Sequence, residues 1–306
     1  MVLRDTADVK NTLVSSGLRP LSDVGDGLGE KYSTFDQRGG IALAESCSSF
    51  NAQRGSVNVD AMDRVDGLWR RLSFRLLPGC CVQCGAGTLR AADVCVACEA
   101  DLPWNDRCCA LCALPLARSE QRCGRCQKTL PEFDLAHCAL RYEWPLDALI
   151  TRFKFVGDLA AGRVLSAVMI AHVSAQWRAS PAPRPQLLIP VPLHAQRLRE
   201  RGFNQALELA RPVAQALALS LIADGLCRQR ATPPQTGLNA LHRRRNMRGA
   251  FAINTDVQGR DVALVDDVVT TAATVRECAK VLKRAGAASV QVWAVARAAA
   301  GARVAS

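Results

Sequence analysis

Two aspartates and a run of small and hydroxylated residues stand side by side near the C-terminal end of the chain. Asp266 and Asp267 follow the apolar run 262–265, and a threonine-rich loop follows them. Adjacent carboxylates accept hydrogen bonds from sugar hydroxyls and offer the oxygen ligands that Mg²⁺ prefers. A loop of small residues entering a helix offers a phosphate its backbone N–H groups and the positive end of the helix dipole. We therefore expect a sugar phosphate to bind at Asp266, Asp267, Thr270, Thr271, Ala272, Ala273 and Thr274.

A plainer interpretation of this stretch is a buried strand followed by a threonine-capped helix, with both aspartates in solvent. A threonine N-cap contributes about 1 kcal/mol. That role accounts for one threonine, but not for three threonines beside two acids. The binding interpretation is therefore preferred.

A second polar segment follows another short apolar run, Leu187–Val191. It brings a glycine and several arginines to a strand-to-helix junction, and guanidinium groups bind phosphate oxygens through paired hydrogen bonds. We expect a pyrophosphate group here, with the candidate residues Arg197, Arg201, Gly202, Asn204 and Gln205. The stretch 193–250 holds ten arginines and three acidic residues, a net charge of +7. This favours an anionic partner, either phosphates or a nucleic acid, although a solvated arginine-rich surface has the same composition.

Most of the fourteen cysteines lie in an internal repeat between residues 80 and 133. Its CxxC pairs recur with an offset of 28 residues, which predicts two copies of one small module. A CxxC knuckle presents two thiolates from one turn, and two knuckles complete a tetrahedral zinc site. Sequential pairing predicts two structural Zn²⁺ ions, one bound by Cys81, Cys84, Cys95 and Cys98, the other by Cys109, Cys112, Cys123 and Cys126.

Other arrangements of these cysteines stay open. They are interleaved pairing, disulfides, an iron–sulfur cluster, and a shifted register in which Cys80 or Cys108 replaces its neighbour. The isolated Cys47, Cys138, Cys227 and Cys278 are interpreted as ordinary small core or loop residues.

Strand and helix patterns alternate from about Leu135 onward. Apolar runs predict strands over 136–142, 187–191, 262–265 and 289–296, and helical periodicity predicts helices over 146–155, 159–177, 203–217 and 274–285. This alternation is typical of an α/β domain with a mostly parallel sheet covered by helices on both faces. In such sheets, ligands bind beyond the carboxyl ends of the strands.

The N-terminal part of the chain has a different texture. Residues 1–61 are rich in Gly, Ser and Asp without sustained periodicity, so we expect a disordered tail. Met62 is an alternative start, before an amphipathic helix, that would leave this tail untranslated. We therefore divide the chain into a tail 1–61, an amphipathic helix with a tandem zinc ribbon 62–134, and an α/β domain 135–300. No apolar run approaches the ~20 residues that span a bilayer and no secretory segment follows Met1, so we expect a cytoplasmic protein with no membrane span.

Several motifs taken jointly resemble the ComF family of competence proteins, including its GntX-like members, from about Trp69 to Ala298. They are Pro-Val-Pro-Leu-His at 190–194, Arg-Gly-Phe-Asn-Gln at 201–205, Arg-Arg-Asn-Met-Arg-Gly-Ala-Phe at 244–251 and Val-Asp-Asp-Val-Val-Thr-Thr at 265–271, behind paired CxxC motifs. The acidic, threonine-rich stretch also resembles the phosphoribosyl-pyrophosphate motif of type I phosphoribosyltransferases.

The resemblance implies a double zinc ribbon joined to a phosphoribosyltransferase fold, and a role in handling incoming single-stranded DNA or in DNA use. It implies that Asp266 and Asp267 hold the ribose hydroxyls of phosphoribosyl pyrophosphate, with Mg²⁺, and that 270–274 surround its 5′-phosphate. We expect either phosphoribosyl transfer to an acceptor or a non-catalytic nucleic-acid-handling or regulatory protein that senses this ligand. Single-stranded DNA and a protein of the DNA-uptake machinery are the expected partners.

Two positions carry open alternatives. The family usually has glycine where this chain has Ala272, and alanine costs about 1–2 kcal/mol in a left-handed conformation but nothing at negative φ. Lys154 lies in a stretch that also matches the family. It is either a ligand-binding residue or a surface lysine beside a core Phe155.

Overall fold

The computed structural model describes residues 79–88, 90, 92–118, 122–179, 183–229 and 249–299. The predicted tail 1–61, the amphipathic helix after Met62 and the arginines at 243–245 lie outside these described residues. So does the proposed boundary at residue 61.

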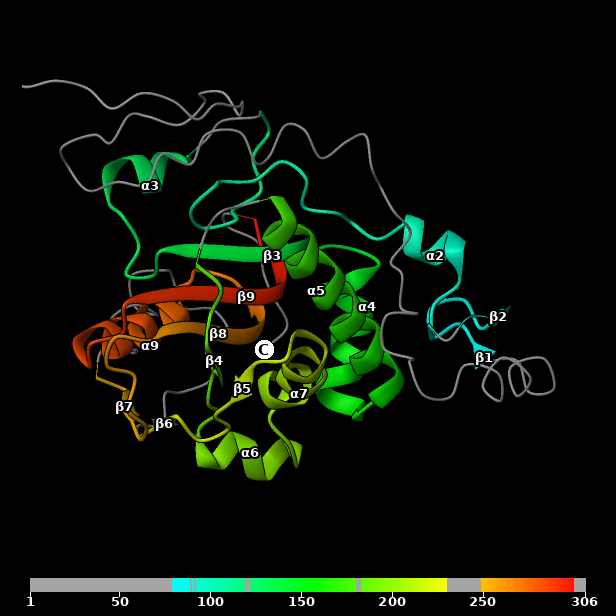
Figure 1. Ribbon diagram of the computed structural model, residues 1–306. Helices are drawn as coiled ribbons and strands as arrows, with labels where there is room; N and C mark the ends of the chain where they lie inside the picture. The colour runs from blue at the N-terminus through cyan, green and yellow to red at the C-terminus, as the bar shows by residue number, and fades with distance from the viewer. Residues whose placement is uncertain are drawn as a thin grey trace, which may run out of the picture. The chain divides into compact units, whose positions relative to one another are not determined.

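A parallel sheet forms the centre of the α/β part of the chain (Figure 1), with the strand order β3-β9-β8-β4-β5. Each pair of neighbouring strands in it runs parallel. The strands are β3 Leu135–Arg141, β4 Leu187–Pro190, β5 Ser220–Leu221, β8 Asp261–Val269 and β9 Ser289–Arg297. The predicted α/β class with a mostly parallel sheet is confirmed. The prediction omitted β5, because two residues are too few to show a strand periodicity.

Helices cover both faces of this sheet (Figure 1), and alternate strand residues face opposite sides. In β8, Val262 and Leu264 pack in one core cluster, while Ala263 and Val265 pack in the other. The helix α9, Ala273–Arg284, contacts β8 and β9 on the first side. The second side is covered by α4 Leu146–Thr151, α5 Leu159–Ala179 and α7 Gln205–Leu217.

Among the described residues, α5 is the helix that is long and apolar enough to cross a membrane by length and composition alone. It packs against β3, β9 and α7. Its buried residues include Leu165, Val168 and Met169, which belong to the core cluster on that side of the sheet. Packing inside the domain therefore accounts for its apolar character.

The cysteine-rich part has little regular structure. It contains the antiparallel pair β1 Gly79–Cys80 and β2 Gly87–Thr88, and the short helices α2 Val96–Ala100 and α3 Gly124–Lys128. The second repeat packs into the core: Cys109, Cys112, Cys123 and Cys126 share a cluster with residues of β8, β9 and α9. The two copies of the repeat thus have different surroundings.

Three further elements complete the description. A π-helical turn, η2 Arg152–Val156, continues α4, and a short helix, α6 Ala195–Arg201, precedes α7. The strands β6 Leu226–Arg228 and β7 Phe251–Ile253 form a small antiparallel pair. The helix predicted over 203–217 begins at Gln205, because Asn204 caps it with its side chain.

Candidate functional site

The acidic pair lies inside β8 rather than after it, so the strand predicted to end at Val265 is longer than expected. β8 continues to Val269, and Asp266 and Val268 pair with residues of β9. Asp267 is buried, and Asp266 is half-buried. The two residues also interact directly, since the Asp267 backbone N–H donates to Asp266 Oδ1 at 2.9 Å.

Lys154 is the partner of the buried carboxylate. Its Nζ lies 2.9 Å from Oδ2 of Asp267, and both side chains are about nine-tenths buried. The surface-lysine alternative is therefore wrong, and so is the core position for Phe155, which is 51% exposed while Phe153 is buried. The cause is η2, whose wider turn directs Phe153 and Lys154 inward before Gly157 ends it in a left-handed conformation.

The environment of Asp266 favours its protonated form. Burial raises the pKa of this carboxyl to about 8, the negative charge of Asp267 adds to the rise, and Lys154 opposes it. A cation or hydroxyl donors placed beside this carboxyl would therefore stabilise its ionised form.

The threonine-rich loop leads directly into α9, as predicted, but Ala272 has φ 62°. This is the left-handed alternative, in which alanine is strained. Thr270, Thr271, Ala273 and Thr274 are half-buried, and α9 carries no acidic residue in its first turn. The N-terminal end of a 12-residue helix therefore faces a partly open loop lined by hydroxyls, which suits a phosphate.

The second polar segment forms α6 and the turn into α7. Gly202 is in a left-handed conformation at the end of α6, and the Asn204 side chain caps α7 and bonds the Val191 carbonyl. These two residues have local structural roles. Arg201 Nη1 donates to Gln205 Oε1 at 3.1 Å, and the Nε2 group of the buried Gln205 has no hydrogen-bond partner among the described residues. Burial lowers the pKa of Arg201, and the charge of Asp267 opposes this, so the arginine lies within electrostatic reach of the acidic pair.

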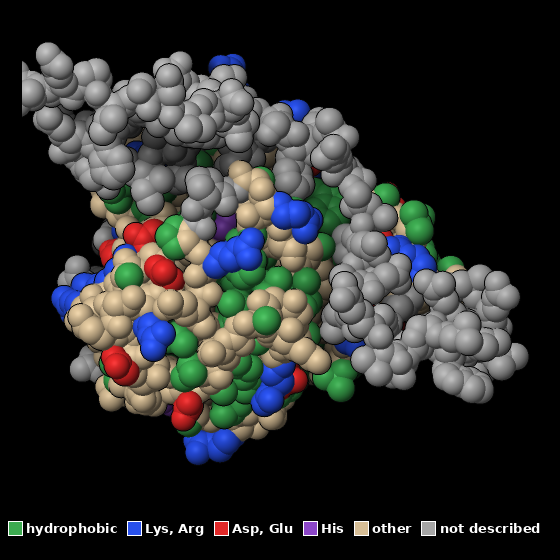
Figure 2. Space-filling model, viewed as in Figure 1, with side chains coloured by type: hydrophobic (Ala, Val, Ile, Leu, Met, Phe, Trp, Pro, Cys, Tyr) green, Lys and Arg blue, Asp and Glu red, His purple; other side chains and the backbone are tan. Residues whose placement is uncertain are grey.

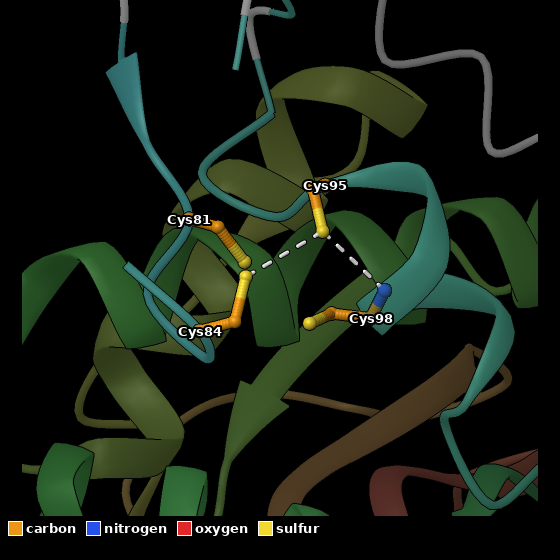
Figure 3. A group of neighbouring side chains, drawn as sticks. All are labelled: Cys81, Cys84, Cys95 and Cys98. Carbon is orange, nitrogen blue, oxygen red and sulfur yellow. Dashed lines mark hydrogen bonds between the residues drawn. The ribbon is translucent and has the colours of Figure 1, made fainter. Parts of the chain in front are cut away.

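The eight predicted zinc ligands form two groups of four, in the predicted sequential pairing. In each group the sulfur atoms lie within 4.8 Å of one another. Figure 3 shows the first group, in which Cys81 and Cys84 face Cys95 and Cys98 across a common centre. The Sγ atoms of Cys84 and Cys95 are 3.8 Å apart, and the Cys98 backbone N–H donates to Cys95 Sγ. Cys80 and Cys108 stand outside both groups, which excludes the shifted register.

Both groups suit zinc by their chemistry, since four thiolates at such separations form the donor set of a structural Zn²⁺ site. Burial raises the pKa of Cys81, but backbone N–H groups outweigh it and bring the pKa to about 6. A hydrogen bond from Cys112 and further backbone N–H groups lower the pKa of Cys109 to about 4, against the effect of burial. Each group thus contains a cysteine poised to bind as a thiolate. Of the isolated cysteines, Cys138 and Cys278 are buried and Cys227 is partly buried, as expected, and Cys47 lies outside the described residues.

Two arginines connect the second cysteine group to the phosphate loop, and neither was singled out from the sequence. Arg297, at the end of β9, donates from Nε to the Cys112 carbonyl at 3.1 Å and from Nη1 to the carbonyls of Val269, at 2.8 Å, and Thr270. Arg125, between two ligand cysteines in α3, donates to the Thr271 carbonyl at 3.3 Å. No sequence pattern could have predicted these contacts, because each arginine bonds to backbone carbonyls 27 to 185 residues away.

Comparison with known proteins finds relatives that match between 51% and 56% of the chain. The chain is 40% identical over 156 residues to the DNA utilization protein YhgH of Escherichia coli O157:H7, covering 51% of this chain and 69% of the relative. It is 36% identical over 174 residues to competence protein F of Haemophilus influenzae, covering 56% and 76% respectively. No family model matches the chain. A solved structure of the allosteric regulatory enzyme of purine biosynthesis matches 41% of this chain and 23% of its own length, with 21% identity and a TM-score of 0.27.

Proposed function

Because the chain belongs to the family of competence protein F and the DNA utilization protein YhgH, we propose that it binds phosphoribosyl pyrophosphate with Mg²⁺ and acts in the uptake or use of single-stranded DNA. One observation carries the choice of ligand. At the end of β8, a buried lysine–aspartate pair adjoins a half-buried carboxyl and a threonine-rich loop at a helix N-terminus.

The ribose is assigned to the acidic pair. Sugar hydroxyls donate hydrogen bonds, and Asp266 and Asp267 supply carboxylate acceptors next to each other on one strand. Lys154 pairs with the buried Asp267 at 2.9 Å and fixes the position of its carboxylate. Hydroxyl donors and a nearby cation offset the raised pKa of Asp266, so we expect it to lose its proton when the ligand binds.

The 5′-phosphate is assigned to the loop 270–274. The donors are the hydroxyls of Thr270, Thr271 and Thr274 and the N–H groups at the start of α9, of which that of Ala273 also lies 3.4 Å from Thr271 Oγ1. The helix dipole favours the negative charge. The pyrophosphate is assigned to Arg197 and Arg201. Gln205 Nε2, which has no hydrogen-bond partner within the described part of the chain, is a further donor.

Mg²⁺ fits this proposal because it takes oxygen ligands and is usually held by one or two carboxylates together with substrate phosphates. Asp266 and Asp267 would hold it, directly or through the ribose hydroxyls. Its contribution when bound is to neutralise the pyrophosphate charge. The described residues supply the orientation and the hydrogen-bond donors.

Isothermal calorimetry of phosphoribosyl pyrophosphate with Mg²⁺ tests this ligand directly. We expect saturable binding by the full chain and none by the Asp266→Asn/Asp267→Asn double variant. Asp261→Asn is the matched control, since Asp261 lies at the opposite end of β8 and bonds Ser289, and it should bind like the parent. All three proteins should contain two zinc ions. Binding that survives in the double variant would refute the site assignment.

The DNA role rests on the relatives' names and on the basic segment 193–250, and it implies a cytoplasmic location and contact with a DNA-uptake protein. Single-stranded DNA affinity should fall steeply with salt if the arginines contact phosphates. A flat dependence of log affinity on log salt concentration would count against this part of the proposal.

Turnover is a separate part of the proposal. We propose phosphoribosyl transfer to an acceptor with release of pyrophosphate. The alternative is a ligand sensor without turnover, and the strained Ala272 favours it, since the family usually has glycine at this loop position. A pyrophosphate-release assay over a panel of nucleobase and amine acceptors, at saturating ligand, separates the two. Absence of release with intact binding supports the sensor.

A further inference from the structure

The π-helical turn η2 places an aromatic side chain on the surface next to the candidate site. Phe153 and Lys154 point inward, whereas Phe155 is 51% exposed. Phe153 packs against Phe203, with ring centroids 5.7 Å apart. The turn is therefore held from inside by an aromatic contact and by the ion pair of Lys154 with Asp267. π-Helical turns are rare and frequently mark functional sites.

Arg201 connects this exposed ring to the acidic pair. Its guanidinium carbon lies 5.1 Å from the centroid of the Phe155 ring, and its Nη1 is fixed by Gln205. The charge of Asp267 also acts on it. Arg201 thus contacts the aromatic ring and lies within electrostatic range of the acidic pair.

Exposed apolar side chains stand near Phe155 and Arg201 in the sequence. Leu159 follows the turn at the start of α5 and is 61% exposed, and Leu198 lies one helical turn before Arg201 in α6 and is 42% exposed. Arg152, on the same turn as Phe155, is partly exposed and pairs with Asp158. Figure 2 shows hydrophobic side chains beside Lys and Arg side chains on the described surface around α6 and α7. An apolar ring with cationic neighbours suits a planar, electron-rich group attached to an anion. A purely apolar protein segment does not use the guanidinium groups.

We propose that Phe155 and Arg201 form a stacking platform for the nucleobase of a nucleotide whose ribose and 5′-phosphate occupy the acidic pair and the loop 270–274. This proposal rests on the proposed function, because it assumes the ribose phosphate is bound there. A nucleobase is bonded to the ribose carbon that carries the pyrophosphate in phosphoribosyl pyrophosphate. It leaves that carbon from the opposite face of the ribose ring, because the pyrophosphate is α-linked and the base of a nucleotide is β-linked, so the two groups occupy different places and the Phe155 ring is assigned to the base.

Two ligands that differ by the base test this proposal. Ribose 5-phosphate and adenosine 5′-monophosphate are titrated with Mg²⁺ by calorimetry into the full chain. We expect the nucleotide to bind about 5- to 150-fold more tightly, the range given by base stacking on an aromatic side chain. In Phe155→Ala this ratio should fall to about 1 while the affinity for ribose 5-phosphate stays unchanged. Phe155→Trp should preserve or increase the ratio.

Val156→Ala is the matched control, since Val156 is the neighbouring residue and is 77% exposed. It should leave the affinity for both ligands unchanged. Equal affinity of the two ligands for the parent chain would overturn the platform. So would an unchanged ratio in Phe155→Ala, which is the result expected if the ring serves a protein partner instead. Failure of ribose 5-phosphate to bind at all would overturn the proposed function, and the two failures are therefore distinguishable.

Discussion

The buried side chain of Arg297 joins the second cysteine group to the phosphate loop, and removing it is the most informative perturbation of the site. The residue is 3% exposed, and its guanidinium donates to carbonyls on both sides: Cys112 in the knuckle, Val269 and Thr270 at the start of the loop, and Ala298. Arg297→Met keeps most of the side-chain length and removes all of these bonds.

The expected loss can be worked out from these bonds. Hydrogen bonds to charged groups contribute about 1.5–3 kcal/mol each. Counting one bond to the knuckle and one to the loop predicts a loss of about 3–6 kcal/mol in the free energy of unfolding. The loop should also lose its anchor, so the affinity for phosphoribosyl pyrophosphate should fall by at least about tenfold, equivalent to about 1.4 kcal/mol.

Urea unfolding measures the first effect, and calorimetry at a temperature where the variant is fully folded measures the second. Arg260→Met, at an exposed arginine just before β8, is the control and should change neither quantity. Arg297→Lys keeps the charge but cannot reach both partners as a planar fork does, so it should lose affinity while losing less stability. A folded Arg297→Met with the parent's affinity would refute the positioning role.

Three further predictions concern other described residues. Lys154→Met leaves a buried carboxylate without its partner and should lower the free energy of unfolding by about 3–5 kcal/mol, measurable by urea unfolding. Ala272→Gly relieves about 1–2 kcal/mol of left-handed strain in the folded state. The added conformational entropy of the unfolded chain opposes this gain by about 0.4–1 kcal/mol, so chemical denaturation should show a free energy of unfolding that is higher by roughly 0.5–1 kcal/mol. Burial lowers the pKa of His137 to about 3 and that of His172 to about 4. Because the unfolded chain binds these protons from about pH 6.5 downward and the folded chain does not, stability should fall as pH drops from 6.5 toward 4, and a His137→Phe/His172→Phe variant should show a smaller decline.

Sequence patterns predicted the main elements because their signals are periodic and local. The core strands are continuous apolar runs and the helices repeat apolar residues with a period of 3.6, and α9 and β9 lie within two residues of their predicted bounds. The predicted end of β8, at Val265, was wrong. Asp266 and Asp267 resemble the polar end of a strand, but β9 continues to pair with this part of β8. Short elements such as β5 and α6 carry too few residues to show a period.

The residues that support the site were harder to find, because their partners are distant in sequence. The two groups of four cysteines follow directly from a 28-residue repeat, whereas Lys154 meets Asp267 only because a π-helical turn reverses the usual inward and outward positions. The left-handed φ of Ala272 could not be read from a residue type that normally avoids it. Tertiary packing decides both features.

The two arginines beside the loop also affect the direction in which its N–H groups point. Arg297 binds the carbonyl of Thr270, and Arg125 binds that of Thr271. In a trans peptide unit, the C=O and the following N–H point in opposite directions. The N–H groups of Thr271 and Ala272 therefore point away from the second cysteine group. Positive charge on the carbonyl side also polarises both peptide units so that their N–H groups become stronger donors. Through Arg297 and Arg125, the second cysteine group thus binds the carbonyl side of the loop. The N–H groups on the other side then face the place where we propose that the phosphate binds.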